Sequence, residues 1–324
     1  MTVTVTAGIT FSGGGFTFQP ILPPSQNAIF GFGNVPVAPY YSAITNLVSN
    51  TGVVATDTPV AVATKGGLAA STYGTDKAIF GFGYAGAPIS NYSSLTNLVS
   101  NTGVVASDTP GVGTARQNLA AAGYGTDKAI FGFGDNPSYP SGSSLTNLVS
   151  NTGVVASDTP GVGTTRSYPA AARYGTDKAI FGFGQNSPLG AISITNLVSN
   201  TGVVATDTTG VGTARFALAA AGYGTDKAIF GYGQAPGGVN TAITNLVSNT
   251  GVVASDTPGV GTARQSPAAA TYGGDKAIFG YGYAAAPLNS PVSLTNLVSS
   301  AGVVATDTTG VGTARQALAA TSYN

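Results

Sequence analysis

A six-residue stretch, AIFGFG, occurs six times in this chain of 324 residues and constrains its fold more than any other feature. Successive copies lie 49 to 51 residues apart, the last two read AIFGYG, and they begin at Ala28, Ala78, Ala129, Ala179, Ala228 and Ala277. A fixed period of this length is typical of repeat architectures, in which one small unit is stacked many times into a single body. The repeats therefore predict one domain over residues 28–324, although length alone suggests about two.

Each repeat contains four short segments with the composition of β-strands. In chain order they are AIFGFG, TNLVSNTG, VVASDT and an alanine-rich segment such as LAAAGY, and turn residues follow the second and third segments. Small side chains suit the innermost strand of sheets that crowd around a central axis. Four strands per repeat at this period match the blade of a β-propeller.

The ends of the chain predict how the ring closes. The alanine-rich segment occurs six times, and its last copy, LAATSY, has no AIFGFG after it, whereas the first AIFGFG, at Ala28, has no alanine-rich segment before it. We therefore expect these two segments to pair. The predicted fold class is all-β: a six-bladed β-propeller of four-stranded blades, closed by the C-terminal strand and without an exposed sheet edge. The alternative is a seventh blade built from residues 1–27, which the short length of this segment disfavours.

Residues 1–27 are expected to form an arm outside the repeats. Gly13 to Gly15 interrupt this segment, and Pro20, Pro23 and Pro24 predict a stiff, extended chain after them. Such an arm could dock onto a partner or onto a sister subunit in a homo-oligomer. The alternative is a poorly ordered tail, because termini are loose unless other contacts hold them.

The charge composition excludes several classes of partner. Only 7% of the residues are charged, twelve Lys or Arg balance twelve Asp, and Glu is absent. The chain therefore lacks the basic patch that binds nucleic acid or acidic membranes. No apolar run approaches the roughly 18 residues of a membrane span. The N-terminus has no positive start or apolar core of a secretory signal, so an extracellular destination would need another route.

The repeat resembles that of kelch-type β-propellers. Kelch repeats place an Arg, a small-residue strand and an Ile-aromatic-x-aromatic-Gly-Gly strand in order, and TAR, LAAAGYGTDK and AIFGFG follow this order from Arg116 to Gly134. The resemblance covers residues 28–324. Gly-Phe-Gly or Gly-Tyr-Gly replaces the Gly-Gly doublet, and the chain has no Trp. The resemblance implies the propeller fold, and we do not expect the functions of that family to carry over.

The near-identical repeats and the segment GITFSGGG resemble structural proteins of tailed bacteriophages, particularly marine and cyanobacterial ones. This resemblance implies a virion protein in an extracellular particle, anchored to other virion proteins through residues 1–27. The expected function is non-enzymatic: a tail- or capsid-associated appendage that recognises a host-surface glycan or protein. The alternatives are a purely architectural decoration protein, a glycan-processing propeller enzyme and an intracellular kelch-like adaptor.

The repeats differ mainly at two sites. From TN to the next cation the spacing is always 20 residues, and from that cation to the next AIFGFG it is always 13, so length varies only in the loop after AIFGFG. The second variable site is the residue pair after the cation, such as Gln117 and Asn118. Because the strands of a blade alternate in direction, we expect both sites on one face, which we call the variable face. Binding residues usually lie on such loops above a rigid scaffold.

Aromatic residues at these two sites are the candidate ligand-binding residues. With the Asn, Ser, Gly and Pro around them they resemble the rigid-aromatic and adaptable-polar mixture of recognition loops, and their rings could stack on sugars. The candidates are Tyr40, Tyr41, Tyr84, Tyr92, Tyr139, Tyr168, Phe216 and Tyr283. The alternative is that these loops vary because no function constrains them.

Every repeat also carries an Asp in SDT or TDT, followed eight residues later by a cation. The aspartates are Asp57, Asp108, Asp158, Asp207, Asp256 and Asp307, and the cations are Lys65, Arg116, Arg166, Arg215, Arg264 and Arg315. They could form rings of ligands for a cation or a charged substrate. Six-fold repetition favours a structural role instead, in which the Asp caps a turn and the cation joins neighbouring blades.

The absence of His, Cys and Glu disfavours catalysis. Without them the usual general bases, thiol nucleophiles and transition-metal clusters cannot be assembled. Calcium bound by Asp and carbonyl oxygens is an alternative, although the chain has no consensus loop for it. We therefore expect no enzyme activity, no cofactor and no metal site.

Overall fold

The protein is all-β in the computed structural model, which describes residues 7–12, 15–20, 26–187 and 190–324. These residues form many small antiparallel sheets and no α-helix, and one 3-10 turn, η1, spans Pro236–Gly238. In the described part of the chain no helix has the length and apolar character needed to cross a membrane.

Each main antiparallel sheet has an AIFGFG strand next to the TNLV strand of the same repeat and, on its other side, the alanine-rich strand that ends the preceding repeat, with the last repeat supplying that strand for the first. The AIFGFG strands are β3 (Asn27–Gly31), β8 (Lys77–Gly81), β13 (Lys128–Gly132), β16 (Lys178–Gly182), β21 (Lys227–Gly231) and β27 (Lys276–Gly280). The alanine-rich strands on one side are β7 (Ala69–Tyr73), β12 (Ala120–Tyr124), β15 (Ala170–Tyr174), β20 (Ala219–Tyr223), β26 (Ala268–Tyr272) and β31 (Ala319–Tyr323). The TNLV strands on the other side are β4 (Ile44–Val48), β11 (Thr96–Val99), β14 (Thr146–Val149), β19 (Thr195–Val198), β24 (Thr244–Val247) and β30 (Thr295–Val298).

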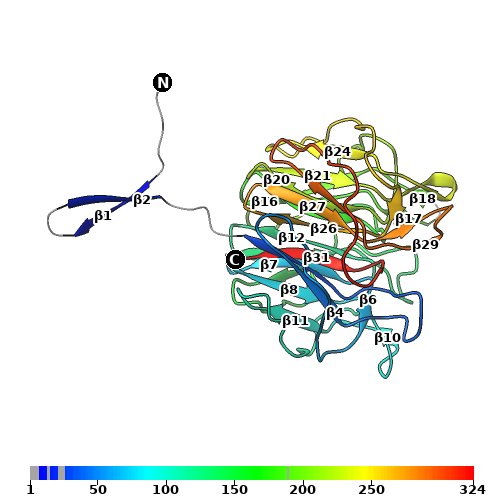
Figure 1. The fold of residues 1–324 in the computed structure, drawn as a ribbon. Helices are drawn as coiled ribbons and strands as arrows, with labels where there is room; N and C mark the ends of the chain where they lie inside the picture. Colours follow the sequence, from blue (N-terminus) through cyan, green and yellow to red (C-terminus); the bar gives the residue numbers. More distant parts are fainter. Residues whose placement is uncertain (1–6, 13–14, 21–25, 188–189) are drawn as a thin grey trace.

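Short strands occupy the loops after the AIFGFG strands and, in two cases, the segment before the next alanine-rich strand. The latter two are β6 (Lys65–Gly66) and β25 (Arg264–Gln265), and the strands in the loops are β9 (Tyr84–Ala85), β10 (Asn91–Tyr92), β17 (Gln185–Asn186), β18 (Gly190–Ala191), β22 (Gln234–Ala235), β23 (Val239–Asn240), β28 (Tyr283–Ala284) and β29 (Ser290–Pro291). Several of them, including β10, β17, β18 and β29, lie together on the right-hand side of the view in Figure 1.

The two ends of the repeat region share one sheet. Strand β31 pairs with β3 from Asn27 opposite Tyr323 to Gly31 opposite Ala319. The predicted pairing of the last alanine-rich segment with the first AIFGFG is therefore confirmed, and Figure 1 shows the red β31 beside the blue start of the body. The six alanine-rich strands also contact one another in order, β7, β12, β15, β20, β26 and β31, and β31 contacts β7. This closed cycle of contacts surrounds a common axis.

Aromatic side chains pack each sheet against the next. Phe131 on β13 reaches the preceding sheet, where a Cβ placed on Gly81 would lie only 2.8 Å from its Cζ atom. The ring of Phe131 also meets that of Phe82 with centroids 5.1 Å apart. Equivalent aromatic pairs lie at the other five boundaries, including Phe30 with Tyr281 across the two chain ends. The glycine of AIFG is thus required by the neighbouring repeat, because any side chain there would displace a buried ring.

The strand predicted for VVASDT is interrupted in most repeats. In one of them Val149 pairs with Val155 and Thr146 pairs with Thr159. Between these two bridges the VVASDT segment therefore has one residue more than the TNLV strand that it pairs with. This mismatch is a β-bulge, and the Nδ2 atom of Asn147 fills it by donating to a backbone oxygen at 3.1 Å. Each sheet therefore has three continuous strands and a bridged fourth segment. The exception is the sheet of β31, β3 and β4, which adds β5 (Thr58–Pro59).

The described part of the predicted arm is a β-hairpin. Strands β1 (Ala7–Ser12) and β2 (Gly15–Pro20) pair from Ala7 opposite Pro20 to Ser12 opposite Gly15. Pro23 and Pro24, on which the prediction of a stiff chain rested, lie outside the described residues.

Candidate functional site

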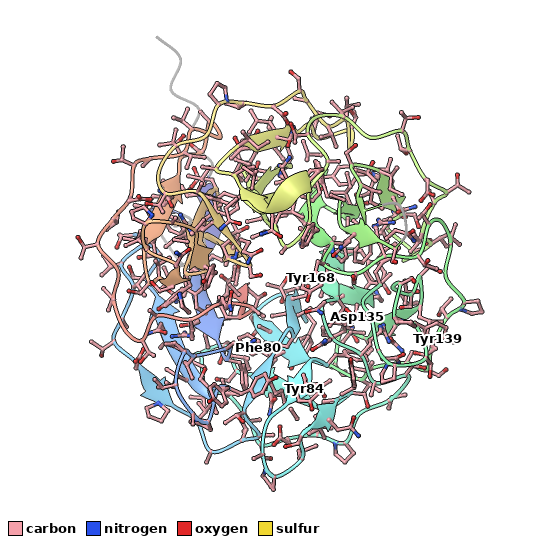
Figure 2. All side chains as sticks on the ribbon, turned by 90° about the vertical axis from the view of Figure 1, so that its right-hand side faces the viewer. Phe80, Tyr84, Asp135, Tyr139 and Tyr168 are labelled. Atoms are coloured by element: carbon pink, nitrogen blue, oxygen red, sulfur yellow. The ribbon has the colours of Figure 1, made fainter. Side chains whose placement is uncertain are left out.

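The two variable sites of each repeat are joined by backbone pairing, which places them on one face as predicted. The first residue of the pair after the cation bridges the start of the next loop, as Gln117 does with Asp135. The equivalent pairings are β6 with β9, Ser167 with Gln185, Phe216 with Gln234, β25 with β28, and Gln316 with Asn34. Figure 2 looks onto this variable face.

The second residue of each pair forms a closed ring of backbone hydrogen bonds around the axis. The Tyr168 N–H donates to the Asn118 carbonyl at 2.7 Å, Asn118 N–H donates to Gly67, and Gly67 N–H donates to Ala317. Ala317, Ser266 and Ala217 continue the series in the same sense until Ala217 N–H donates to Tyr168. All six residues have a positive φ between 50° and 62°. Because only their backbone makes the ring, their side chains are free to differ.

The hydrogen-bonded ring surrounds a hollow of about 350 Å³, which we call the axial cup. Its wall combines aromatic rings with side-chain amides, and it contains residues from every repeat. The lining residues are Asn34, Tyr41, Gly66, Gly67, Gln117, Asn118, Tyr168, Phe216, Ala217, Gln265, Ser266, Gln316 and Ala317. The residue pair after each cation, which is the most variable site apart from the loops, therefore lines the cup around the axis.

A ring of apolar residues closes the axis beneath the cup. It consists of the residue that follows each ring residue in the chain and surrounds a space of only about 70 Å³. Its members are Leu68, Leu119, Pro169, Leu218, Pro267 and Leu318, all of which are buried. We call this set the apolar ring. It separates the cup from the rest of the axis.

The structure divides the candidate aromatic residues into an inner and an outer group. Tyr41, Tyr168 and Phe216 line the cup, and the Tyr168 and Phe216 rings meet edge to face at 5.9 Å. Tyr84 stacks on Tyr41 at 5.5 Å and meets Tyr92 at the same centroid distance. The five rings thus form two sets, Tyr168 with Phe216 and Tyr41 with Tyr84 and Tyr92, and both sets contribute to the wall of the cup.

The other three candidates are not part of this aromatic group. Tyr40 and Tyr139 are 61% and 43% exposed, and Figure 2 shows Tyr139 near the rim, whereas Tyr168 lies close to the axis. Tyr283 lies on β28, where its carbonyl oxygen accepts from Asn240 Nδ2. Membership of a variable loop therefore did not distinguish residues that line the cup from residues that point outward.

Asp135 is a polar member of this site that the sequence analysis did not select. Its Oδ1 accepts from Asn118 Nδ2 at 2.9 Å, and its Oδ2 accepts from Gln117 Nε2 at 3.4 Å. With Tyr168 it lines an adjoining hollow of about 170 Å³, and Figure 2 shows the two side by side. The sequence did hold a signal: eleven of the twelve aspartates belong to the repeated SDT, TDT and DK motifs, and Asp135 is the twelfth.

Burial shifts the pKa of both titratable groups at this site. Burial raises the pKa of Asp135, and the hydrogen bonds from Asn118 and Gln117 act against that increase. Burial also raises the pKa of Tyr168, with the charge of Asp135 acting in the same direction, so the phenol keeps its proton at neutral pH. The site thus offers hydroxyl and amide donors, a carboxyl acceptor and flat apolar rings to a ligand.

The repeated cations are buried between neighbouring sheets. Arg116 Nε donates to the Phe133 carbonyl at 2.7 Å and Nη2 to Asn147 Oδ1 at 2.6 Å, while its guanidinium lies 4.6 Å from the ring of Phe82 in the preceding sheet. Burial lowers the pKa of Arg116 to about 10, so it stays charged at neutral pH. Lys65 makes the corresponding contact with Asn97 Oδ1 at 2.6 Å.

Each cation faces the Asp of the following sheet rather than the Asp eight residues before it. Arg116 Nη1 lies 3.7 Å from Asp158 Oδ1, whose carboxylate also accepts from the backbone and hydroxyl of Thr114. Matching ion pairs join Lys65 to Asp108, Arg215 to Asp256, Arg264 to Asp307, and Arg315 to Asp57. Arg166 donates to Asn196 Oδ1. Burial acts to raise the pKa of Asp207, but hydrogen bonds from Thr164 and Asn196, together with the charge of Arg166, outweigh it and lower the pKa. Apart from the Nε atoms of Arg166 and Arg264, which have no hydrogen-bond partner among the described residues, these groups are engaged within the fold and offer no ring of open ligands.

Comparison with known proteins does not assign the chain to a family. No protein-family model matches it, and a search of curated proteins finds no match. Within the described residues no group of three or more Asp, Glu, His or Cys side chains is placed to hold a metal ion.

Proposed function

We propose that the chain is a six-bladed β-propeller whose axial cup binds a glycan, and that it is a non-enzymatic, tail- or capsid-associated component of a virion. The closed cycle of strand contacts and the hydrogen-bonded ring around the axis support the propeller. Each sheet then corresponds to one blade. The virion location rests on the resemblance of the repeats and of GITFSGGG to phage structural proteins, with the arm as the anchor to other virion proteins.

One observation carries the proposed binding function. The repeats are almost identical where they pack against one another, and they differ where their side chains meet at the axial cup. A carbohydrate presents apolar ring faces and many hydroxyl groups. The cup offers Tyr41, Tyr168 and Phe216 as stacking surfaces, side-chain amides as donors and acceptors, and Asp135 beside them as an acceptor.

The polar group at this site favours binding over hydrolysis. Glycosidases generally use two carboxyl groups on either side of the bond that is cleaved. The residues that line the hollow beside Asp135 are Pro140, Ser141, Ser167, Tyr168, Gln185 and Ser187, none of which is acidic. A single carboxylate among amides and hydroxyls is suited to holding sugar hydroxyls.

The test is binding of the purified protein to intact bacterial cells and to glycans extracted from their surface. A cup variant, Tyr168→Ala with Phe216→Ala, is compared with a matched rim variant, Tyr40→Ala with Tyr139→Ala. We expect saturable binding by the wild type and the rim variant, and at least tenfold weaker binding by the cup variant, since losing one good stacking contact costs about 1.4 kcal/mol. Equal loss in both variants would contradict the cup as the site. If the wild type bound neither cells nor glycans, the result would favour the purely architectural decoration protein. Release of sugar from the glycans would support the glycan-processing enzyme.

A further inference from the structure

A second cavity lies on the axis, among the alanine-rich strands. It has a volume of about 300 Å³, and all six of those strands contribute to its wall. Small residues such as Ala122, Gly123 and Ala221 leave this space open. Its lining shares no residue with that of the axial cup or with the apolar ring. We call it the axial cavity, and it is a site separate from the cup.

One residue breaks the repetition of this cavity. The fourth position of the alanine-rich strand is Thr72, Gly123, Gly222, Thr271 or Ser322 in five repeats, whereas β15 carries Arg173 there. Eleven of the twelve cations in the chain belong to the buried set or to the repeated DK motif, and Arg173 is the twelfth. A single guanidinium thus occupies a position that carries a small, uncharged residue in the other five strands.

The surroundings of Arg173 leave its charge poorly compensated. Its Nε atom is buried and has no hydrogen-bond partner among the described residues. Burial lowers the pKa of Arg173, and the charge of Asp177 acts against that decrease. Asp177 itself pairs with Lys178 at 3.1 Å and accepts from Asn200 Nδ2. An arginine carries a planar fork of N–H donors, and burying such donors without acceptors is costly.

The wall of the axial cavity contains no compensating acid. Its charged lining residues are Arg173 and Lys227, and Lys227 is paired with Asp226 at 2.8 Å. None of the other lining residues is Asp or Glu. A cavity with a free guanidinium, hydroxyl side chains and no carboxylate favours a negatively charged ligand with several oxygen acceptors.

We propose that the axial cavity binds a small free oxyanion, a phosphate, sulfate or carboxylate compound, held by the guanidinium of Arg173. Arginine recognises such groups through two parallel N–H···O bonds. Thr176 and Thr225, which also line the cavity, add hydroxyl donors. The proposal does not depend on glycan binding at the cup, because the two sites use different residues.

The test is calorimetric titration of the full-length protein with inorganic phosphate, sulfate and citrate at constant ionic strength set with sodium chloride. The key variant is Arg173→Thr, because Thr72 and Thr271 show that this fold accepts Thr at that position. The matched control is Lys128→Thr, which removes one positive charge outside the cavity lining. We expect saturable binding of at least one anion by the wild type and the control, and at least tenfold weaker binding by Arg173→Thr.

Two results would overturn the proposal: no saturable binding of any of the three anions by the wild type, or equal affinity in Arg173→Thr. The same loss in Lys128→Thr would also overturn it, because the effect would then report net charge. Phosphorus NMR line broadening of phosphate gives an independent readout. Glycan binding by the same variants, measured in parallel, distinguishes failure of the axial cavity from failure of the cup.

Discussion

At the scale of single residues, Asp135 and Asp158 show how surroundings give the same side chain opposite effects on stability. Burial raises the pKa of Asp135. Burial also acts upward on Asp158, but hydrogen bonds from Thr114 and Asn147 and the charge of Arg116 outweigh it and lower the pKa. Folding therefore disfavours the charged form of Asp135 and favours the charged form of Asp158.

We predict that Asp135→Asn and Asp158→Asn shift the urea midpoint in opposite directions at pH 7. A raised folded pKa means that Asp135 costs stability once pH rises above the unfolded Asp value of about 3.9, so Asp135→Asn should raise the midpoint at pH 7 and not at pH 3. A lowered folded pKa means that Asp158 contributes stability that is lost as pH falls. Asp158→Asn should cost about 2 kcal/mol at pH 7, because it removes hydrogen bonds to a charged group, and less at pH 3.

The measurement is urea unfolding of the wild type and both variants at pH 7 and pH 3. Asp135→Asn keeps one oxygen acceptor for Asn118 Nδ2, and the Gln117 amide can turn so that its Oε1 accepts from the new Nδ2, so a gain at neutral pH reports the charge. A loss of stability at pH 7 for Asp135→Asn, or a pH-independent effect of both substitutions, would contradict the assignment.

At the scale of strands, the glycine of each AIFG segment sets the distance between sheets. A Cβ on Gly132 would lie 2.8 Å from Phe181 Cζ and 3.3 Å from Thr146 Cγ2, both fixed by packing. A Cβ on Gly123, on the neighbouring strand β12, would meet only Thr72 Oγ1 at 3.2 Å among close side-chain atoms. The two glycines thus offer a matched comparison within one sheet.

We predict that Gly132→Ala destabilises the protein by about 1–3 kcal/mol, because an added methyl group overpacks the contact with Phe181. Gly123→Ala should change stability by less than about 1 kcal/mol, and in the favourable direction if its neighbour adjusts. Chemical denaturation of both variants checks this difference. Equal costs for the two substitutions would mean that loss of glycine in a strand, and not contact between sheets, controls the effect.

The sequence predicts the strands better than the axial site, for physical reasons. The strands repeat six times, and each copy combines β-forming residues with turn residues, so their order and the pairing of β31 with β3 follow from counting. The hydrogen-bonded ring depends on the sign of φ. Gly67 and Asn118 favour a positive φ, but Tyr168 and Ala217 adopt it only because the neighbouring repeats hold them there.

The sequence also did not predict how close each variable side chain lies to the axis. Tyr139 and Tyr168 both belong to variable sites, yet one is exposed at the rim and the other lines the cup. Asp135 and Arg173, in contrast, can be found without a structure. They are the two charged residues that belong to no repeated motif, and each lines a cavity.

At the scale of the whole molecule, the two chain ends replace one turn of the repeat. In the other sheets a turn such as Gly74–Asp76 joins the alanine-rich strand to the AIFGFG strand, and the Gly74 N–H donates to the carbonyl of Asp127 in the next sheet. At the chain ends Asn324 N–H donates to Asp76, and the Gln26 carbonyl accepts from Gly273. Asn324 and Gln26 therefore occupy the first and third places of this turn.

We predict that a circular permutant in which a single glycine joins Asn324 to Gln26 folds with a urea midpoint at least equal to that of residues 26–324. Glycine suits the missing second position, because Thr75 has φ +71° there. New ends are placed between Gly237 and Gly238, where an added Cβ would meet nothing within 4 Å. Circular dichroism and urea unfolding give the comparison. An unfolded or markedly weaker permutant would contradict the equivalence of the chain ends with a turn.

The pairing of β3 with β31 also concerns the order in which a ribosome makes the chain. Strand β3 is the first strand of the body to emerge, and its partner β31 emerges only after the ribosome has passed Tyr323. Until then β3 has a vacant edge that cannot be filled by its own sheet. While the body is being translated, the edge of β3 must therefore be covered or remain unpaired. Truncated chains that lack β31 would expose the unpaired edge of β3, which could then pair with a strand of another chain.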